Sequence, residues 1–180
     1  MFGKTSRAAS RIQSRWNEVQ KTYFCVLDDS SGLDRLKHAS ETDGGGGDWC
    51  VLRGLMRRKS SGSGVNQQEK DLENRKGWSV HVAPYEKSVD ILLDDANYRK
   101  CSLRWKLLSG PHSSPPAMAT AIVVRTNQGA RHMIRALLSR CGHCPIAGDL
   151  RYGAVKPLPD ESVALHAVAL RLPETVQLGK

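Results

Sequence analysis

The spacing of apolar residues changes abruptly near residue 128, and this change restricts the folds open to the chain. From Met118 to Thr126, the sequence MATAIVVRT is a short apolar run that favours a strand. Beyond Asn127-Gln128-Gly129 the apolar residues follow helical spacing and form one stripe: Ala130, Met133, Ile134, Leu137, Leu138 and Cys141. The sequence therefore predicts a strand followed directly by an amphipathic helix.

Three further segments are predicted to be strands. CSLRWKLL, residues 101–108, alternates apolar and polar side chains, which is the period of a half-buried strand. KTYFCVL, residues 21–27, and SVALHAVALRL, residues 162–172, are short apolar runs suited to strands. Strands thus outnumber helices. We expect an α+β fold with a mixed, mainly antiparallel sheet and packed helices.

Residues 28–78 differ in composition from the rest of the chain. Two stretches rich in Gly, Ser and charge flank WCVLRGLMRRK, residues 49–59, which is apolar enough to be one strand of a hairpin. The run of four glycines, 44–47, is interpreted as a linker and not a phosphate loop, because no Gly-Lys-Ser/Thr follows it. A chain of 180 residues suits one domain. We therefore expect a single domain over residues 1–180 with a low-complexity, partly disordered insertion at about 28–78.

The chain is strongly basic, with a formal net charge of +9 and a pI of about 9.6. Such a surplus is typical of proteins that bind a polyanion, most often nucleic acid and less often an anionic membrane; a soluble basic protein without such a partner is the alternative. No segment approaches the roughly 18 apolar residues of a membrane span. Five scattered cysteines do not form a disulfide framework. Reduced thiols favour an intracellular site, the cytoplasm or an organelle such as the mitochondrion, over secretion.

The first 17 residues contain Arg and Ser but no acidic residue, which is typical of a mitochondrial presequence. A folded helix also fits this segment, because its apolar side chains fall on one face: Ala8, Ala9, Ile12, Trp16 and Val19. Three arginines at intervals of four lie along another face of that helix: Arg7, Arg11 and Arg15. These arginines are candidate contacts for RNA phosphates.

Cys141-Gly142-His143-Cys144 matches the redox motif of disulfide isomerases. A redox pair opens a helix, whose N-terminus stabilises the thiolate. Here the pair follows the apolar stripe, Gly142 is a candidate C-cap, and Pro145 ends the helix. No second ligand pair accompanies it, as a zinc site would need. We expect Cys141 to pack in the core and Cys144 to fill a turn, with neither redox activity nor a metal.

Arg131, His132 and Arg135 lie off the apolar stripe near the start of the same helix. Arg131 and Arg135 are four residues apart, so both can face one side. By themselves these residues fit an ordinary solvated face as well as a binding surface.

The ordered array RHMIR, PIAGDLRYGA and ALHA closely resembles the C-terminal half of the RluA-like RNA pseudouridine synthases. That family typically shows Thr-Gly-Arg-x-His-Gln-Ile-Arg, Pro-Ile-x-Gly-Asp-x-x-Tyr-Gly and Leu-His-Ala. FGKTSRAASRI followed by KTYFCVL also looks like the family, which favours a folded first helix over a presequence. The resemblance covers residues 1–27 and 99–172. It implies a pseudouridine-synthase-like catalytic domain.

The chain departs from the family pattern at several points. Gln128-Gly129-Ala130 stands where Thr-Gly-Arg is usual, and Met133 replaces a Gln. The family nucleophile is an Asp in an Arg-Leu-Asp-like loop shortly before the segment that matches MFGKTS, and no Asp of this chain has that context. Asp149 belongs to the Gly-Asp loop, which the family does not use as nucleophile. The expectation is a domain that is incomplete at its N-terminal side.

The resemblance implies roles for individual residues. Tyr23 would pack against the base of the target uridine, and Arg135 would pair with the missing Asp. Lys21, Arg131 and His132 would line the path of the RNA. The chemistry needs a carboxylate but no metal and no cofactor.

Two functions stay open at this point. The chain is either part of a synthase that acts on structured RNA such as rRNA or tRNA, or an inactive RNA-binding or ribosome-assembly module with the same fold. In both, the partner is RNA, no membrane is involved and a monomer is expected. The chain alone is expected to be inactive.

Overall fold

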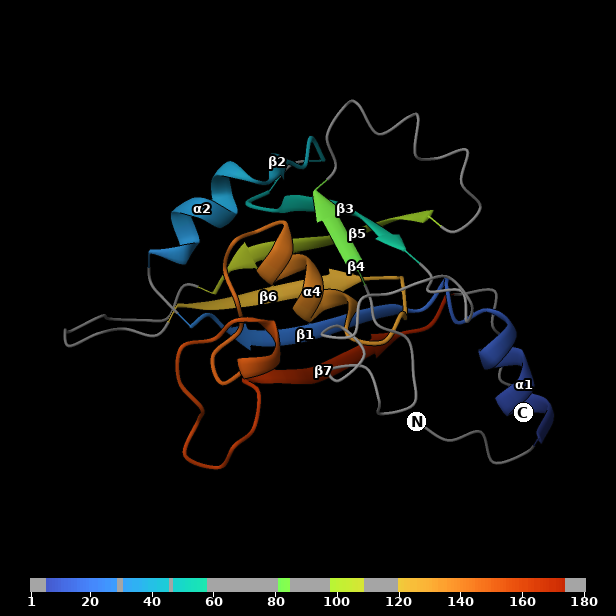
Figure 1. Cartoon of the computed structure of the whole chain (residues 1–180). Coiled ribbons are helices and arrows are strands. Elements are labelled where there is room, and N and C mark those ends of the chain that lie inside the picture. The colour runs from blue at the N-terminus through green and yellow to red at the C-terminus, as the bar shows by residue number, and fades with distance from the viewer. Residues whose placement is uncertain are drawn as a thin grey trace, which may run out of the picture.

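The computed structural model of the chain describes residues 6–28, 31–45, 47–57, 81–84, 98–108 and 120–173 (Figure 1). Among these residues, seven strands form one sheet in the order β2-β3-β5-β6-β1-β7, and β4 pairs with β3 off this path. All of its strand pairs are antiparallel, which confirms the predicted α+β fold with a mainly antiparallel sheet. The strands are β1 (Gln20–Val26), β2 (Glu41–Thr42), β3 (Cys50–Arg57), β4 (His81–Pro84), β5 (Tyr98–Leu107), β6 (Ala121–Thr126) and β7 (Leu165–Arg171). The helices are α1 (Ser6–Ser14), α2 (Gly32–His38), α4 (Met133–Arg140) and the 3-10 helix η2 (Leu150–Tyr152).

Strand β5 buries alternate side chains, as the sequence predicts. On β5, Cys101, Leu103 and Trp105 are no more than 2% exposed, whereas the residues between them are half-buried or exposed. Leu107, the last member of the predicted alternation, is 43% exposed at the end of the strand. The apolar side of β5 continues onto β6 and β1, and these strands form one wall of the core.

Helix α4 forms the opposite wall of that core. Its buried side chains, Met133, Ile134, Ala136, Leu137 and Leu138, lie against the sheet (Figure 1). The predicted stripe is thus confirmed, but the helix begins three residues later than Ala130. His132 precedes it in the left-handed conformation, with φ of 60°. This backbone position turns the chain out of β6 and onto the face of the sheet.

Part of the predicted insertion belongs to the folded domain. Residues 31–57 form α2, β2 and β3, and the side chains of Leu36 and Leu52 are 0% exposed in the core. The indole of Trp105 donates a hydrogen bond of 2.9 Å to the hydroxyl of Ser40, which ties this segment to β5. The predicted strand within residues 49–59 is confirmed as β3. Residues 31–45 and 47–57 of the predicted insertion are thus described as folded, and residues 58–78 lie outside the described residues.

Cys141-Gly142-His143-Cys144 lies at the C-terminal end of α4, where the sequence places it. Cys141 is 4% exposed and Cys144 is 0% exposed, so both are core side chains. The sequence suggested Gly142 as the helix C-cap, but the residue with a left-handed backbone is His143, with φ of 48°. A Cβ atom at Gly142 would lie 2.7 Å from Leu36 Cδ1 and 2.8 Å from Leu138 O. Glycine therefore permits the close approach of α2 to the end of α4.

The N-terminal helix is present as α1 but is shorter than the predicted apolar face. Two residues of that face lie beyond its end: Trp16 is 37% exposed and Val19 is 0% exposed. Figure 1 shows α1 beside the end of the sheet where β1 begins. In the described part of the chain, no helix has both the length and the apolar character needed to cross a bilayer.

Candidate functional site

A buried ion pair joins α4 to the loop that follows it. The Arg135 guanidinium donates from Nε to Asp149 Oδ2 and from Nη2 to Asp149 Oδ1, both at 2.6 Å. Asp149 is 0% exposed and the Arg135 side chain is 19% exposed. The hydrogen bonds to Asp149 raise the pKa of Arg135, although burial opposes this shift. This bidentate geometry fixes the plane of the guanidinium.

Backbone hydrogen bonds hold the loop that carries Asp149. Ile146 bridges to Leu27 at the end of β1, and Ala147 N donates to Val26 O at 2.9 Å. Gly148 has φ of 78°, and a Cβ atom there would collide with Ser162 O. Only glycine suits this turn, so the Gly-Asp sequence places the carboxylate beneath α4.

Two further polar rings complete the cluster. Tyr152 lies under Arg135, whose guanidinium carbon is 5.0 Å from the centre of the phenol ring. The Tyr152 hydroxyl is 3.3 Å from His132 Nδ1, and the two rings meet edge to face at 5.8 Å. Burial and then the charges of nearby arginines lower the pKa of His132, which favours its neutral form. The cluster thus combines a fixed cation, a buried carboxylate, a neutral imidazole and a phenol.

Tyr23 lies on the same side of the sheet as α4. It pairs with Val124 of β6 and Ala167 of β7, and its half-buried ring packs against the hydrophobic core. Burial raises the pKa of its hydroxyl. Among the described residues, no hydrogen bond joins Tyr23 to Arg135, so the structure places the two predicted active-site residues on one face but not in polar contact.

Lys21 is buried at the entry of β1. It is 2% exposed, and its ammonium donates to three backbone carbonyls: Trp16 O at 2.8 Å, Val19 O at 3.1 Å and Asn127 O at 2.7 Å. The ammonium also lies 4.7 Å from the centre of the Trp16 ring. Burial lowers its pKa. Lys21 therefore holds the entry of β1 together, and the suggestion that it lines an RNA path stays a prediction.

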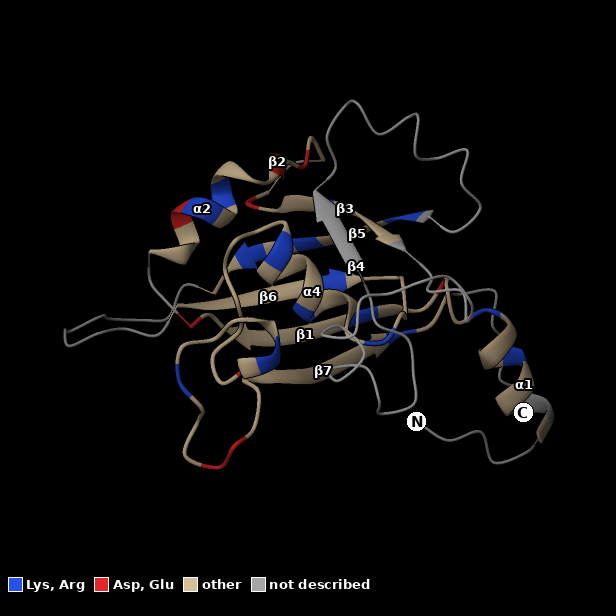
Figure 2. Cartoon of the chain, viewed as in Figure 1, with Lys and Arg blue, Asp and Glu red and all other residues tan. Residues whose placement is uncertain are grey.

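The remaining predicted RNA contacts form two separate groups. Arg131 is exposed and lies just before α4, next to His132. Arg11 is exposed on α1, and Arg15 lies past its end and pairs with Glu18 at 3.1 Å. Arg7 is in α1, but its side chain lies outside the described residues. The structure thus brings Arg131, His132 and Arg135 together and leaves the α1 arginines apart from them (Figure 2).

Sequence reasoning missed the partner of Arg135. It assigned that place to an Asp outside the chain, whereas the structure pairs Arg135 with Asp149. It also gave no role to Tyr152. The signal was present in the Gly-Asp-x-x-Tyr-Gly motif, which contains both residues.

Comparisons with known proteins give a likeness of fold. No protein-family model and no curated protein sequence matches this chain. Two solved human structures are similar to it. RNA Pseudouridylate Synthase Domain Containing 1 has a TM-score of 0.51 and 19% identity over 93% of this chain and 54% of its own. RNA Pseudouridylate Synthase Domain Containing 4 has a TM-score of 0.51 and 13% identity over 94% of this chain and 60% of its own. This chain therefore has the fold of these domains and spans little more than half of each.

Proposed function

We propose that this chain is the RNA-recognising part of an RNA pseudouridine synthase of the RluA-like kind. One observation carries the proposal: the fold matches two human RNA pseudouridylate synthase domain proteins over more than nine-tenths of the chain. The clustering of Arg135, Asp149 and Tyr152 supports it, because these residues come from the two motifs that carry the resemblance. The substrate is a uridine in a structured RNA such as rRNA or tRNA.

The reaction defines what the site must supply. The N1–C1′ bond of uridine breaks, the base turns, a C5–C1′ bond forms, and the proton on C5 leaves while N1 gains one. A positioned carboxylate starts this sequence. Asp149 does not fit that role, because it is fully buried and both its oxygens accept hydrogen bonds from Arg135. We assign Asp149 as a positioning residue for Arg135.

Arg135 keeps one nitrogen for a ligand. Nε and Nη2 are used on Asp149, and among the described residues Nη1 makes no hydrogen bond. With 19% of its side chain exposed, Arg135 can present Nη1 to a catalytic carboxylate or an RNA phosphate. In this proposal Tyr23 supports the target base, and Arg131 and His132 contact the RNA beside it.

A second candidate function is an RNA-binding or ribosome-assembly module that does no chemistry. Ala130 and Met133 favour it, because they stand where the family usually has Arg and Gln.

Tritium release from RNA that contains 5-tritiated uridine separates the two functions. The 180-residue chain is compared with a longer product of the same gene that carries an upstream Arg-Leu-Asp-like loop, if the reading frame supplies one. The synthase proposal predicts release by the longer protein and none by the chain alone. It also predicts that Arg135→Ala lowers turnover of the longer protein sharply. Release by the short chain would show that the nucleophile is misassigned, and an inactive longer protein that still binds RNA would establish the second function.

A further inference from the structure

The face of the sheet opposite α4 carries a group of basic side chains. Arg104 and Lys106 on β5 and Arg125 on β6 alternate with the core residues of those strands, so they point away from the core. Phe24 of β1 pairs with Val123 on the same face and is 44% exposed. We call this surface the second face. None of the residues in the Arg135 cluster belongs to it.

Arg104 and Arg125 lie directly opposite each other in the β5–β6 pairing. Two like charges at such a position destabilise a sheet, and Lys106 adds a third charge two residues further along β5. Asp43 forms an ion pair with Arg104. Among the described residues, no carboxylate pairs with Arg125 or Lys106, so the second face has an excess of positive charge.

The ring of Trp49 lies close to all three cations, Arg104, Lys106 and Arg125. The centre of its ring is 4.4 Å from Arg125 Cζ, 5.3 Å from Lys106 Nζ and 5.5 Å from Arg104 Cζ. Such contacts between cations and an aromatic ring are favourable. The turn between β2 and β3 positions Trp49, whose carbonyl accepts a hydrogen bond of 2.9 Å from Asp43 N. The cations are thus held in place in the absence of a ligand.

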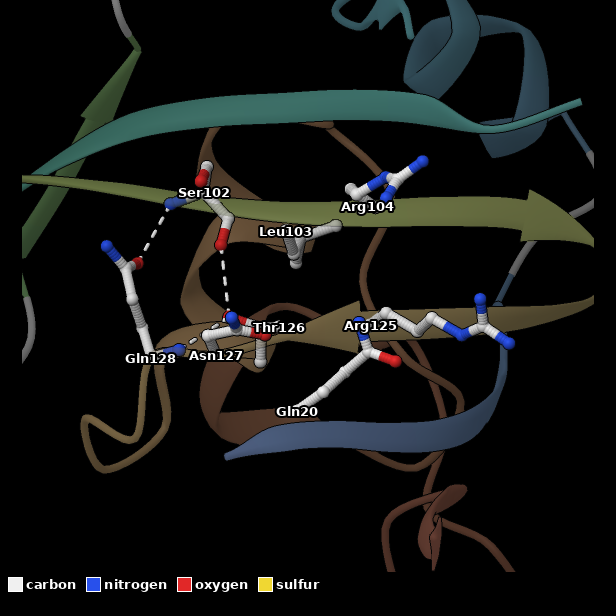
Figure 3. Close-up of a pocket in the computed structure, with 8 residues that line it drawn as sticks. All are labelled: Gln20, Ser102, Leu103, Arg104, Arg125, Thr126, Asn127 and Gln128. Atoms are coloured by element: carbon white, nitrogen blue, oxygen red, sulfur yellow. Dashed lines mark hydrogen bonds between the residues drawn. The ribbon is translucent and has the colours of Figure 1, made fainter. Parts of the chain in front are cut away.

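A pocket of about 320 Å³ adjoins this cluster. It forms where β5 and β6 separate, because their pairing ends at Arg104 and Arg125 and the Gln128 side chain bridges the gap (Figure 3). Gln128 Oε1 accepts from Ser102 N at 3.0 Å, and Thr126 Oγ1 donates to Ser102 O at 3.2 Å. The pocket is lined by Gln20, Ser102, Leu103, Arg104, Arg125, Thr126, Asn127 and Gln128.

Arg125 lies in the wall of this pocket with an unused donor. Its Nε is buried and has no hydrogen-bond partner. A buried donor without a partner costs free energy, and a turn of the Arg125 side chain toward the pocket would let an oxygen of an anionic ligand satisfy it. The unpaired charge, the gathered cations and the unused donor all point to an anionic ligand.

We infer that the second face binds a phosphodiester of single-stranded RNA at Arg125 and Lys106, with the adjoining nucleotide in the pocket beside Gln20 and Asn127. The inference rests on the proposed function in taking RNA as the ligand. RNA fits better than an acidic peptide because the pocket offers amide donors and acceptors for a base edge next to the cations. This contact is separate from the Arg135 cluster on the other face of the sheet, so one RNA would contact both faces.

Fluorescence anisotropy with a labelled single-stranded RNA tests the inference between 50 and 200 mM salt. Arg125→Gln and Lys106→Gln should each weaken binding by about three- to ten-fold. Each should also reduce the slope of log Kd against log salt by about 0.7. Arg125→Lys keeps the charge and should lie between Arg125→Gln and the wild-type protein. Lys156→Gln, on the exposed loop after η2, removes the same charge elsewhere and is the matched control.

A second readout observes the contact itself. In ¹H–¹⁵N spectra, the Arg125 Nε signal, identified by its loss in Arg125→Gln, should shift when RNA is added and should not shift with an equal charge of polyglutamate. The inference is wrong if Arg125→Gln and Lys106→Gln bind RNA like Lys156→Gln, or if polyglutamate shifts the signal equally. Pseudouridine formation with an unmoved Arg125 signal would leave the proposed function standing and reject this inference. A moved signal in a longer protein that carries the upstream Arg-Leu-Asp-like loop and forms no pseudouridine would do the reverse.

Discussion

The position of Arg135 depends on Asp149, a residue 14 positions away whose carboxylate is fully buried. A buried carboxylate without its cation is costly, and the cation left behind when the carboxylate is removed is costly too. The sequence identified Arg135 because it lies off an apolar stripe. It did not identify Asp149 as the partner, because the contact depends on a turn that returns the chain beneath α4.

Asp149→Asn should lower the free energy of unfolding by about 3 kcal/mol, because Arg135 loses its counter-charge in a site that is mostly closed to water. Urea denaturation measures this loss. Asp48→Asn, an exposed residue in the turn before β3, is the control and should leave stability nearly unchanged. The double variant Arg135→Met with Asp149→Leu should recover most of the loss. Equal stability of Asp149→Asn and the control would show that the pair is not closed in solution.

The thiol of Cys141 should be unreactive despite its Cys-Gly-His-Cys context. Burial raises its pKa to about 11, and burial raises the pKa of Cys25 and of Cys101 to about 12. Because the fold favours the protonated thiols, their raised pKa values stabilise the folded protein. This stabilisation is fully present at pH values below the thiol pKa of the unfolded chain, which is near 9. That stability is lost as pH rises through the folded values.

Alkylation of each cysteine, followed by mass spectrometry between pH 6 and 10, measures this directly. Cys141 should be modified slowly at pH 8 and faster only as pH approaches the folded value or the protein unfolds. Urea unfolding over the same series should show stability falling above about pH 9. A Cys141 thiolate that titrates below about pH 7 would restore the redox interpretation.

Among the elements, those with a regular apolar spacing or an apolar run were predicted. β5 and α4 bury alternate and helically spaced residues, and this spacing is visible in the sequence. β1, β6 and β7 were predicted from short apolar runs instead, and in β7 every residue after Leu165 is exposed. α2 was missed because its seven residues, GLDRLKH, contain only two large apolar side chains in a polar segment. Its stability comes from burying Leu36 against the core, which composition alone does not indicate. The setting of Lys21 could not be predicted for a related reason: the carbonyls that bind it belong to the turn at residues 16–19 and to Asn127, which only the folded chain brings together.

The contact between α2 and the end of α4 can be tested by substituting Gly142. Gly142→Ala should destabilise the protein by roughly 1–3 kcal/mol, because the added methyl group meets Leu36 and the Leu138 carbonyl. Gly44→Ala is the matched control, since a Cβ atom there has nothing within 4 Å. Thermal denaturation of both variants compares them. A Gly142→Ala protein as stable as the control would mean that α2 does not approach α4 as described.

At the scale of the described residues, positive charge occurs at several places, among them α1, the start of α4 and the strands of the second face (Figure 2). The net charge of +9 predicted a polyanion partner, but composition could not say where on the fold the charge would lie. The second face in particular combines Trp49, from the segment first interpreted as an insertion, with arginines from two strands. Trp49 and these arginines lie together because β3, β5 and β6 are neighbours in the sheet.

RNA binding by the wild-type chain tests the central claim most directly, because the synthase and the inactive module both require it. The measurement is the dissociation constant for a structured RNA, by fluorescence anisotropy, at several salt concentrations from 50 to 200 mM. The account predicts binding that weakens about ten-fold or more over this range as several phosphates are contacted. An absence of binding, or a dissociation constant that stays flat across the range, would contradict it.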